Sequence, residues 1–459
     1  MSALPPAPVP APSCEDPFDA LMPVERARAR LLDALRPLEG EEIVGLAGAT
    51  GRVTARAVDS PLDVPPEANS AMDGYAIRAA DIPAEGVARL RVIGTAWAGR
   101  PHTGGPVGSG EAVRAFTGAP VPDGADTVVI QERVGGVGEA VVTIDPSAEP
   151  RRNVRPAGED VARGERVFGP GRTLGAADLG VLASLGIARL AVRPRPRVAY
   201  FTTGDELASL DEALAAGTGP ERAGGAGGEG AGGGEGVAGD PPPPPTLPPG
   251  RLWDSNRHVL GALLDRLAVE PIDLGVVPDD PDATREALRE AASRADLAIS
   301  SGGVSAGDAD HVARVFHEIG EVAFWRIAMR PGRPLVSGRV GRCAFLGLPG
   351  NPVAVMVTFL QFVRPAIARL AGAADLEPFE APARCLSPLR KSLGRTEYQR
   401  GVARLDESGE LVVESTGRQG AGRLSSMSAA NCLIVVGPEI ASVSPGDRVR
   451  VQPFAGLLP

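Results

Sequence analysis

The second half of this 459-residue chain alternates regularly between strand-like and helix-like segments, and this alternation most restricts how it can fold. Short apolar runs typical of buried strands are found at 197–202, 272–277, 297–299, 321–327 and 344–346, and apolar residues recur at helical spacing over 256–267, 281–293, 311–319 and 353–370. Strands and helices of these lengths form βαβ units, in which a mainly parallel sheet is covered by helices on both faces. We therefore expect a three-layer α/β/α domain over residues 194–373.

A glycine-rich loop follows the strand-like run at 297–299. Gly302 and Gly303 allow backbone N–H groups to approach a ligand closely, and Asp308 lies at the N-cap position of the next helical segment. A strand, a glycine loop and a helix N-terminus together form a common anion-binding arrangement. From this stretch alone, a tight turn that binds nothing is an equal alternative.

Carboxylates stand beside this loop. Asp308 and Asp310 would repel a bare phosphate, and a divalent cation such as Mg²⁺ between them and the phosphate explains the combination. Ligands bind to sheets of this kind at the carboxyl ends of the strands. Three further polar segments, 203–206, 254–256 and 349–352, are expected at the same edge.

Positive charge gathers in one short segment of an otherwise acidic chain. The formal net charge of −10 argues against nucleic acid or an anionic membrane surface as the main partner. Arg326, Arg330 and Arg333 nevertheless follow one another closely, and their guanidinium groups suit phosphate or another oxyanion. The alternative is a solvated basic turn.

Oxygen ligands dominate the candidate metal site. Glu206, Asp254, Asp308 and Asp310 supply carboxylates with no cluster of His or Cys among them, which favours Mg²⁺ over zinc. The 4 cysteines are widely separated and follow no zinc-ligand or Cys-x-x-Cys spacing, and we see no apolar segment of the length of a signal peptide or membrane helix. We therefore expect a cytoplasmic protein that carries out a Mg²⁺-assisted reaction on a phosphorylated substrate.

The rest of the chain divides around the α/β domain. Residues 1–17 are rich in proline and predict a disordered tail, and residues 211–250, about half of them Gly or Pro, predict a disordered insertion. Residues 18–193 begin with a helical segment and continue as short strand-like runs, which predicts an elongated, strand-rich N-terminal region of two subdomains. Strands return over residues 376–459, where we expect a C-terminal β-barrel-like domain.

Three dense motifs interrupt the N-terminal region. They are NSAMDGYA at 69–76, FTGAPVPDGAD at 116–126 and NVRPAGED at 153–160. Each contains turn-forming residues, and each taken alone is more often structural than functional.

Taken together, the motifs resemble those of the molybdopterin molybdenumtransferase family, which includes MoeA and the E domain of gephyrin. NSAMDGYA, FTGAPVPDGAD, GEDV, TGDEL, SGGVSAGDAD, FWRIAMRPGRP, GLPGNPV and NCLIVV occur in the family's order between about residues 18 and 457. The resemblance implies a homodimer in which the partner protomer completes a cleft, and it allows contacts with other molybdenum-cofactor biosynthesis proteins. The implied substrates are adenylylated molybdopterin and molybdate, and AMP is released when molybdenum enters the dithiolene in the presence of Mg²⁺.

The resemblance also assigns roles to individual residues. The catalytic set that it implies is Asp73, Thr117, Asp160, Glu206 and Asp310. The substrate-binding set is Asp254, Ser301, Gly302, Gly303, Ser305, Arg326, Arg330, Arg333, Pro349, Pro352 and Arg400. The implied Mg²⁺ ligands are Glu206, Asp254 and Asp310.

Two departures from the family pattern affect this site. Arg326 and Arg330 stand where many bacterial members have lysine, and Arg333 follows the same trend, so planar guanidinium groups replace point charges. Ala421 stands where a serine is usual, which removes one hydroxyl contact.

Two other functions compete with the transferase. A molybdopterin adenylyltransferase resembles only the α/β region, so the motifs at 69–76 and 116–126 argue against it. A scaffold that binds pterin or partner proteins without turnover is disfavoured because the whole acidic set is retained.

Overall fold

The computed structural model describes residues 21–217, 245–304 and 311–454. The chain forms two compact units, one of residues 1–40 with 194–459 and the other of residues 41–193. Each unit has hydrophobic clusters of its own, so the two are described separately.

A six-stranded sheet forms the centre of the larger unit, in the order β15-β12-β16-β20-β19-β17. These strands are β12 (Arg197–Thr203), β15 (Glu270–Val277), β16 (Leu297–Ser301), β17 (Glu321–Arg326), β19 (Pro334–Val340) and β20 (Cys343–Leu348). The first four strands in the sheet order pair in parallel, whereas β19 pairs antiparallel with both of its neighbours. Only two residues separate β19 from β20, and so short a connection can join only antiparallel strands. The mainly parallel sheet expected from the sequence is confirmed.

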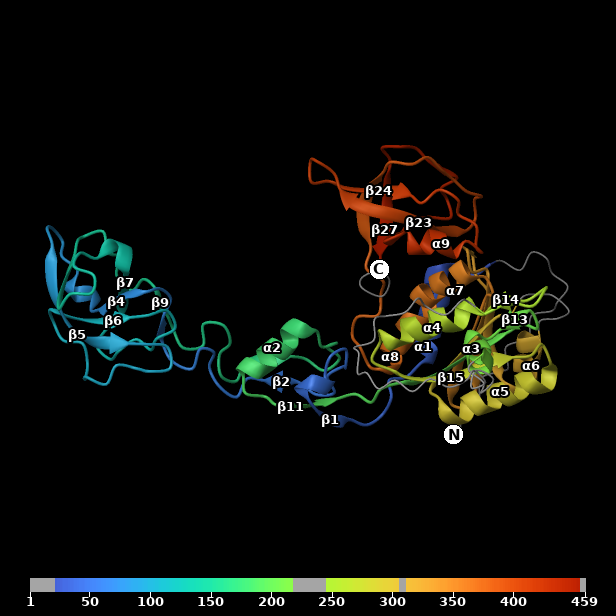
Figure 1. Ribbon diagram of the computed structural model, residues 1–459, viewed down its shortest axis with the longest axis horizontal. Coiled ribbons are helices and arrows are strands. Elements are labelled where there is room, and N and C mark those ends of the chain that lie inside the picture. The colour runs from blue at the N-terminus through green and yellow to red at the C-terminus, as the bar shows by residue number, and fades with distance from the viewer. Residues whose placement is uncertain (1–20, 218–244, 305–310, 455–459) are drawn as a thin grey trace, which may run out of the picture. The chain divides into compact units, whose positions relative to one another are not determined.

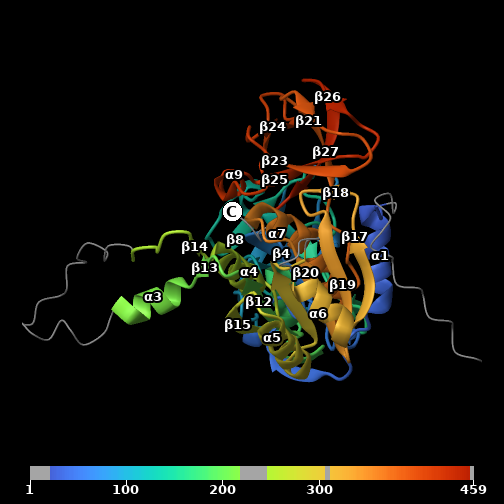
Figure 2. The same ribbon diagram turned by 90° about the vertical axis from the view of Figure 1, so that its right-hand side faces the viewer.

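Helices cover both faces of this sheet (Figure 1). One core holds residues of α1 (Val24–Ala34), α4 (Ser255–Asp265), α7 (Pro352–Thr358) and α8 (Arg364–Leu370), and the other holds residues of α5 (Pro281–Arg294) and α6 (His311–Ile319). Figure 2 shows α5 and α6 side by side. Along β12, Val198 and Tyr200 enter the first core while Ala199 and Phe201 enter the second. Burial on both faces explains why this strand reads as a continuous apolar run.

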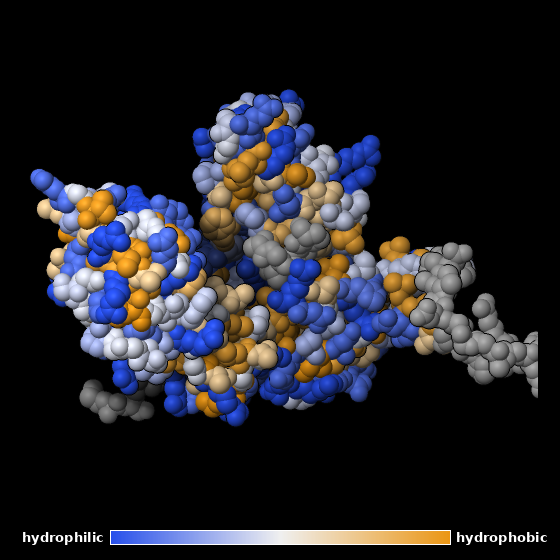
Figure 3. Space-filling model, turned by 60° about the vertical axis from the view of Figure 1, so that its left-hand side comes forward, coloured by the Kyte–Doolittle hydropathy of each residue, from blue (hydrophilic) through white to orange (hydrophobic). Residues whose placement is uncertain are grey.

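One described helix, over residues 352–370, is long and apolar enough to cross a membrane. It includes a π-helical turn at Phe359–Val363, and 83% of its apolar window is buried inside the unit, as in a core helix. The helix therefore belongs to the core and does not indicate a membrane protein. The surface drawn in Figure 3 also has hydrophobic residues interspersed with hydrophilic ones.

A small β-barrel follows the α/β domain. Five of its strands are β21 (Ala381–Cys385), β23 (Thr396–Leu405), β24 (Leu411–Ser415), β25 (Cys432–Val436) and β27 (Arg448–Pro453). The strands pair in the order β23-β24-β21-β27-β25, and the pairing of β25 with β23 closes the circle. The short strand β18 (Met329–Arg330) pairs with β23 and joins the barrel to the segment after β17. The C-terminal β-barrel expected from the sequence is confirmed.

The smaller unit is rich in short strands, as the sequence predicts. Its five-stranded sheet contains β4 (Gly74–Ile77), β5 (Ala88–Ala96), β6 (Glu111–Ala115), β7 (Thr127–Ile130) and β8 (Val141–Ile144). Three antiparallel pairs lie outside this sheet: β1 (Glu42–Gly45) with β11 (Arg189–Val192), β2 (Val58–Asp59) with β10 (Arg166–Phe168), and β3 (Asn69–Ser70) with β9 (Val154–Arg155). Helix α2 (Ala176–Ser184) packs into a cluster separate from that of the five-stranded sheet.

The segment expected to be a disordered insertion is partly ordered. Leu210–Gly217 forms helix α3 at its start, and just outside the segment β14 (Leu252–Trp253) pairs in parallel with β13 (Leu207–Ala208). Glycine and proline are concentrated after this helix. The average composition of residues 211–250 therefore did not reveal that the segment begins with good helix formers. Residues 218–244 and the expected disordered tail, 1–17, lie outside the described residues.

Candidate functional site

A cavity of about 280 Å³, here called the glycine-loop cavity, is lined by loops that follow the parallel strands. Its lining residues include Thr203 at the end of β12 with Gly204 and Glu206 after it, Ser301 at the end of β16 with Gly302 and Gly303 after it, Pro349, Gly350 and Asn351 after β20, and Asn256 and Asp279. Ligands of parallel α/β sheets bind at this edge. The structure thus brings together most of the segments that the sequence placed there.

The two glycines of the loop are required by space as well as by backbone conformation. Gly302 has φ +99° and Gly303 has φ +65°, in the region that side chains disfavour. A Cβ atom on Gly302 would lie 2.6 Å from the Thr203 carbonyl oxygen, and one on Gly303 would lie 2.6 Å from Val312 Cγ2. The loop can therefore pack this closely only with glycine at both positions.

Two buried polar atoms at the cavity have no hydrogen-bond partner among the described residues: Thr203 Oγ1 and Asn256 Oδ1. Their residues are only 7% and 8% exposed, and both line the cavity. The Asn256 amide is oriented because Nδ2 donates to Ser301 Oγ at 3.0 Å and to the Gly350 carbonyl oxygen at 2.7 Å. Buried polar groups are almost always paired, so these two oxygens are points at which a bound ligand or ion would be held.

Two carboxylates, Glu206 and Asp279, also line the glycine-loop cavity. The Asp279 backbone N–H donates to Asp205 Oδ1 at 3.1 Å, and the Asp205 backbone N–H donates to Asp279 Oδ2 at 3.3 Å. Burial raises the pKa of Asp279 above its ordinary value, and the negative charges of Asp205 and Glu206 add to the rise. Asp279 is not among the residues expected from the sequence, although it lies two residues after β15, at the same kind of position as the residues of the other loops.

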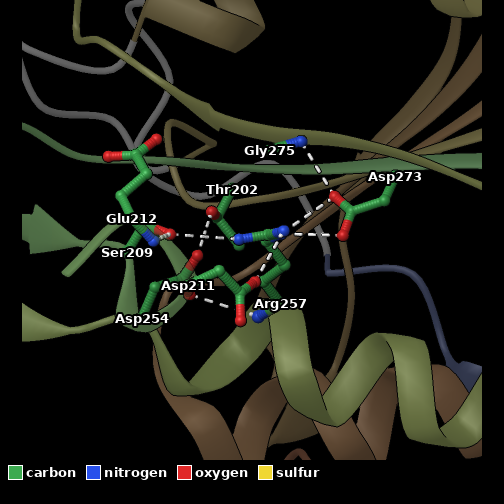
Figure 4. A network of polar contacts seen from close by, with 8 residues as sticks. All are labelled: Thr202, Ser209, Asp211, Glu212, Asp254, Arg257, Asp273 and Gly275. Carbon is green, nitrogen blue, oxygen red and sulfur yellow. Dashed lines mark hydrogen bonds and ion pairs between the residues drawn. The ribbon is translucent and has the colours of Figure 1, made fainter. Parts of the chain in front are cut away.

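Asp254, an expected substrate and metal ligand, does not line the cavity. It is 2% exposed and is the N-cap residue of α4, accepting hydrogen bonds from Thr202 Oγ1 at 2.5 Å and from the Arg257 backbone N–H at 3.1 Å (Figure 4). Arg257 in turn binds both oxygens of Asp273, at 2.8 and 2.9 Å. Both carboxylate oxygens of Asp254 thus accept hydrogen bonds within the protein. These bonds fix α4, and with it Asn256, against β12.

A second cavity, of about 240 Å³ and here called the arginine cavity, lies between the α/β domain and the barrel. Its lining residues include Arg330 and Arg333 from the expected basic segment, and Arg395 and Arg400 from the barrel. Arg326 does not line it; β17 ends at this residue, and its backbone carbonyl oxygen accepts a hydrogen bond from the Met22 N–H at 3.2 Å. Proximity in the sequence therefore identified two members of the cluster and missed Arg395.

The arginine cavity carries more positive than negative charge. Within the described residues, the only ion pair that its four arginines make joins Arg330 to Glu397, with Nη1 4.0 Å from Oε2. Arg400 is 1% exposed, and its guanidinium donates to Ser426 Oγ at 3.0 Å and to the Gly420 carbonyl oxygen at 3.1 Å. Burial lowers the pKa of Arg400 to about 10, which leaves the group charged at neutral pH. A buried cation without a carboxylate partner favours a bound anion.

The segment 349–352 separates the two cavities. Pro349 and Asn351 line both of them, as does Pro334. Pro352 begins α7 and lines neither. Ala421 lines the arginine cavity, so the hydroxyl that the family pattern would supply is missing from this wall.

In the smaller unit, the structure pairs two of the expected catalytic residues. Thr117 donates to Asp73 Oδ1 from its backbone N–H at 2.8 Å and from Oγ1 at 2.7 Å, and these bonds lower the pKa of Asp73. The motif of Asp73 and the motif at 153–160 also meet, because β3 pairs with β9 in the register Asn69 to Arg155. Asp160 is exposed, and its backbone N–H donates to the Val64 carbonyl oxygen at 2.9 Å.

Three residues from the glycine loop, Ser305, Asp308 and Asp310, lie outside the described residues. Within the described ranges, no group of three or more His, Cys, Asp or Glu side chains is arranged to hold a metal ion.

These features define a class: a multidomain α/β protein with an anion-suited glycine loop at its sheet edge and a basic cavity shared with a β-barrel. Three family models match the chain along its length. They are the MoeA N-terminal region (domain I and II) at residues 22–186, a probable molybdopterin binding domain at 199–369, and the MoeA C-terminal region (domain IV) at 382–454. The chain belongs to the molybdopterin molybdenumtransferase (MoeA) family, which confirms the resemblance found in the sequence.

Similar proteins support this assignment over nearly the full length. A molybdopterin molybdenumtransferase of Haemophilus influenzae is 36% identical over 95% of this chain and 100% of its own length. One from Nostoc is 34% identical over 94% of this chain and 93% of its own. The crystal structure of a molybdopterin biosynthesis moeA protein from Pyrococcus horikoshii OT3 is similar with a TM-score of 0.73 and 27% identity, and the match covers 95% of this chain and 100% of that one.

Proposed function

We propose that this protein is a molybdopterin molybdenumtransferase, which inserts molybdate into adenylylated molybdopterin with Mg²⁺-dependent release of AMP. The observation that carries this proposal is the pair of adjoining cavities, one suited to a phosphorylated ligand and the other to an oxyanion. Matches to all three MoeA regions support the transferase over an adenylyltransferase, which resembles the α/β region alone.

The glycine-loop cavity is the proposed site of the adenylylated pterin. Gly302 and Gly303 have positive φ and pack closely against Thr203 and Val312, and a glycine backbone in such a loop can approach a phosphate closely. Ser301, Thr203 and Asn256 add hydroxyl and amide groups, two of which have atoms with no partner in the described protein. These groups would orient the ligand through hydrogen bonds.

The arginine cavity is the proposed site of molybdate. A tetrahedral dianion would accept charge-assisted hydrogen bonds from Arg330, Arg333, Arg395 and Arg400, and such bonds are roughly twice as strong as neutral ones. Arg400 is held in place by Ser426 and Gly420 before any anion binds, so little side-chain conformational freedom remains to be lost on binding.

The residues at the glycine-loop cavity also fit Mg²⁺. This ion usually takes one or two carboxylates and completes its shell with water and substrate phosphates, so a preformed cluster of three is not required. Glu206 and Asp279 supply carboxylates, and Thr203 Oγ1 and Asn256 Oδ1 supply unpaired oxygens. We keep Asp310 as a proposed ligand and place Asp254 behind the cavity wall. When bound, the ion would neutralise the pyrophosphate and polarise its phosphoryl bond.

Asp73, Thr117 and Asp160 are the proposed catalytic residues of the smaller unit. The two hydrogen bonds from Thr117 stabilise the ionised form of Asp73. A carboxylate must be ionised to orient a nucleophile by accepting its hydrogen bond. We further propose that the protein acts as a cytoplasmic homodimer, the arrangement implied by the family resemblance. Its partners would then be a second copy, the two substrates and other proteins of molybdenum-cofactor biosynthesis.

The decisive experiment measures AMP release from adenylylated molybdopterin when molybdate is added, with Mg²⁺ present or chelated. We expect release only when molybdate and Mg²⁺ are both present, and a parallel series with tungstate reports the preference between the two metals. A folded protein that binds the adenylylated pterin but releases no AMP would instead be a scaffold. Formation of adenylylated pterin from ATP would identify an adenylyltransferase.

A further inference from the structure

Among the described residues, the wall between the two cavities contains one polar side chain. Pro334, Pro349 and Asn351 are the residues that line both the arginine cavity and the glycine-loop cavity. The two prolines offer no side-chain hydrogen bond to a passing ligand, whereas the Asn351 amide has two donors and an acceptor. Any small anion that crosses between the cavities along this wall therefore meets Asn351.

Contacts from both cavities hold the segment that carries Asn351. On the glycine-loop side, Ser301 Oγ donates to the Pro349 carbonyl oxygen at 3.2 Å and Asn256 Nδ2 donates to the Gly350 carbonyl oxygen at 2.7 Å. On the barrel side, the Val353 backbone N–H donates to the Ala421 carbonyl oxygen at 3.1 Å. The backbone at Asn351 is thus positioned by both cavities at once.

No hydrogen bond within the described residues explains why residue 351 is an asparagine. It lies at the N-cap of α7, where asparagine usually accepts a hydrogen bond from the second or third helical N–H. Here the N–H of Val353 already donates to Ala421, and the Asn351 side chain does not cap the helix. Within the described part of the chain it makes no side-chain hydrogen bond, and it is exposed.

The charges on the two sides of this wall differ in sign. The arginine cavity has four guanidinium groups and one carboxylate, Glu397, whereas Glu206 and Asp279 are the charged residues that line the other cavity. An oxyanion leaving the arginines would be held back by another cation at the wall and repelled by an anion. A neutral amide can donate to the oxyanion and still release it.

We propose that Asn351 is a positioning residue that guides the oxyanion from the arginine cavity to the ligand in the glycine-loop cavity, by donating a hydrogen bond from Nδ2. This inference rests on the proposed function, since it assigns molybdate to the first cavity and the pterin to the second. It makes Asn351 a determinant of the transfer step and leaves binding at either cavity to other residues.

The test separates binding from transfer in three variants of the full-length protein: Asn351→Asp, Asn351→Ala and Asn351→Gln. Molybdate binding to the pterin-free protein is measured by equilibrium dialysis, pterin binding by fluorescence, and AMP release at saturating molybdate by kcat. We expect Asn351→Asp to lower kcat by roughly a hundredfold and Asn351→Ala by roughly tenfold, with both binding constants changed by less than about twofold. Asn351→Gln, which keeps the amide, should recover part of the loss.

Ser392→Asp is the matched control, because it adds the same charge at an exposed barrel residue that lines neither cavity. Its kcat should equal that of the unaltered protein. The proposal is overturned by an unchanged kcat in Asn351→Asp and Asn351→Ala, and equally by a loss of molybdate binding as large as the loss of kcat. Failure of the unaltered protein to release AMP with molybdate is a separate result, which would remove the proposed function itself.

Discussion

The glycine-loop cavity and the arginine cavity adjoin each other but are assembled in different ways. The first is built mainly from loops that follow neighbouring strands of one sheet, so its residues meet wherever that sheet forms. The second needs the barrel to close against the α/β domain, because Arg395 and Arg400 come from the barrel and Arg330 and Arg333 do not. A site at one sheet edge can therefore be predicted from local sequence patterns, whereas a site between domains cannot.

The largest effect is expected from the buried arginine. Arg400→Ala should weaken molybdate binding by roughly tenfold to 150-fold, because hydrogen bonds to charged groups contribute about 1.5–3 kcal/mol. Arg400→Lys should keep part of the affinity through its charge but lose the planar fork. Equilibrium dialysis with molybdate measures this, and pterin binding serves as the control. A parallel loss of pterin binding would show that the two cavities do not act as separate sites.

A single methyl group should disturb the other cavity. Gly302→Ala should lower the free energy of unfolding by about 1–3 kcal/mol, because Gly302 has positive φ and its new Cβ would meet the Thr203 carbonyl oxygen. Gly350→Ala is the matched control, since the nearest atom to its Cβ would be at 3.7 Å. Urea unfolding measures both variants. Equal stability of the two would contradict the close packing of the glycine loop.

Alanine substitutions of two arginines in the same segment should differ in their effect on the molybdate requirement. Arg330→Ala should raise the molybdate concentration needed for half-maximal AMP release by roughly fivefold to tenfold, since an exposed group contributes about 1 kcal/mol. Arg326→Ala should leave this concentration unchanged, because Arg326 does not line the arginine cavity. A similar rise in both variants would mean that the oxyanion site extends to the end of β17.

The smallest effect should come from restoring a hydroxyl group. Ala421→Ser adds a donor to the wall of the arginine cavity and should lower the molybdate requirement by a few-fold, as expected of one hydrogen bond of about 0.5–1.5 kcal/mol. The same kinetic titration measures it, with Ala429→Ser, on an exposed residue outside the cavity, as the control. If the molybdate requirement of Ala421→Ser is unchanged, the arginines already compensate for the absent hydroxyl contact.

Much of the architecture could be predicted because its signals are local. Alternating strand and helix periods are set by neighbouring residues, and they predicted the mainly parallel sheet, the helix layers and the return to strands in the barrel. The glycine loop was recognisable for the same reason, since Gly302 and Gly303 sit directly after a buried strand. Asp279 has an equivalent place after β15 and could have been found by the same reasoning.

The structure alone decided which polar side chains share a cavity. Asp254 and Asn256 are two residues apart, yet one caps α4 with both oxygens while the other reaches the cavity. Arg326 and Arg330 are four residues apart, yet they lie on different strands, and only Arg330 joins the two barrel arginines. The residue types and the order of the elements could be predicted from the sequence, because backbone preferences and apolar periodicity act over a few residues. The composition of each cavity depends on how β23 and the segment 349–352 pack across long stretches of chain, and only the tertiary structure determines that packing.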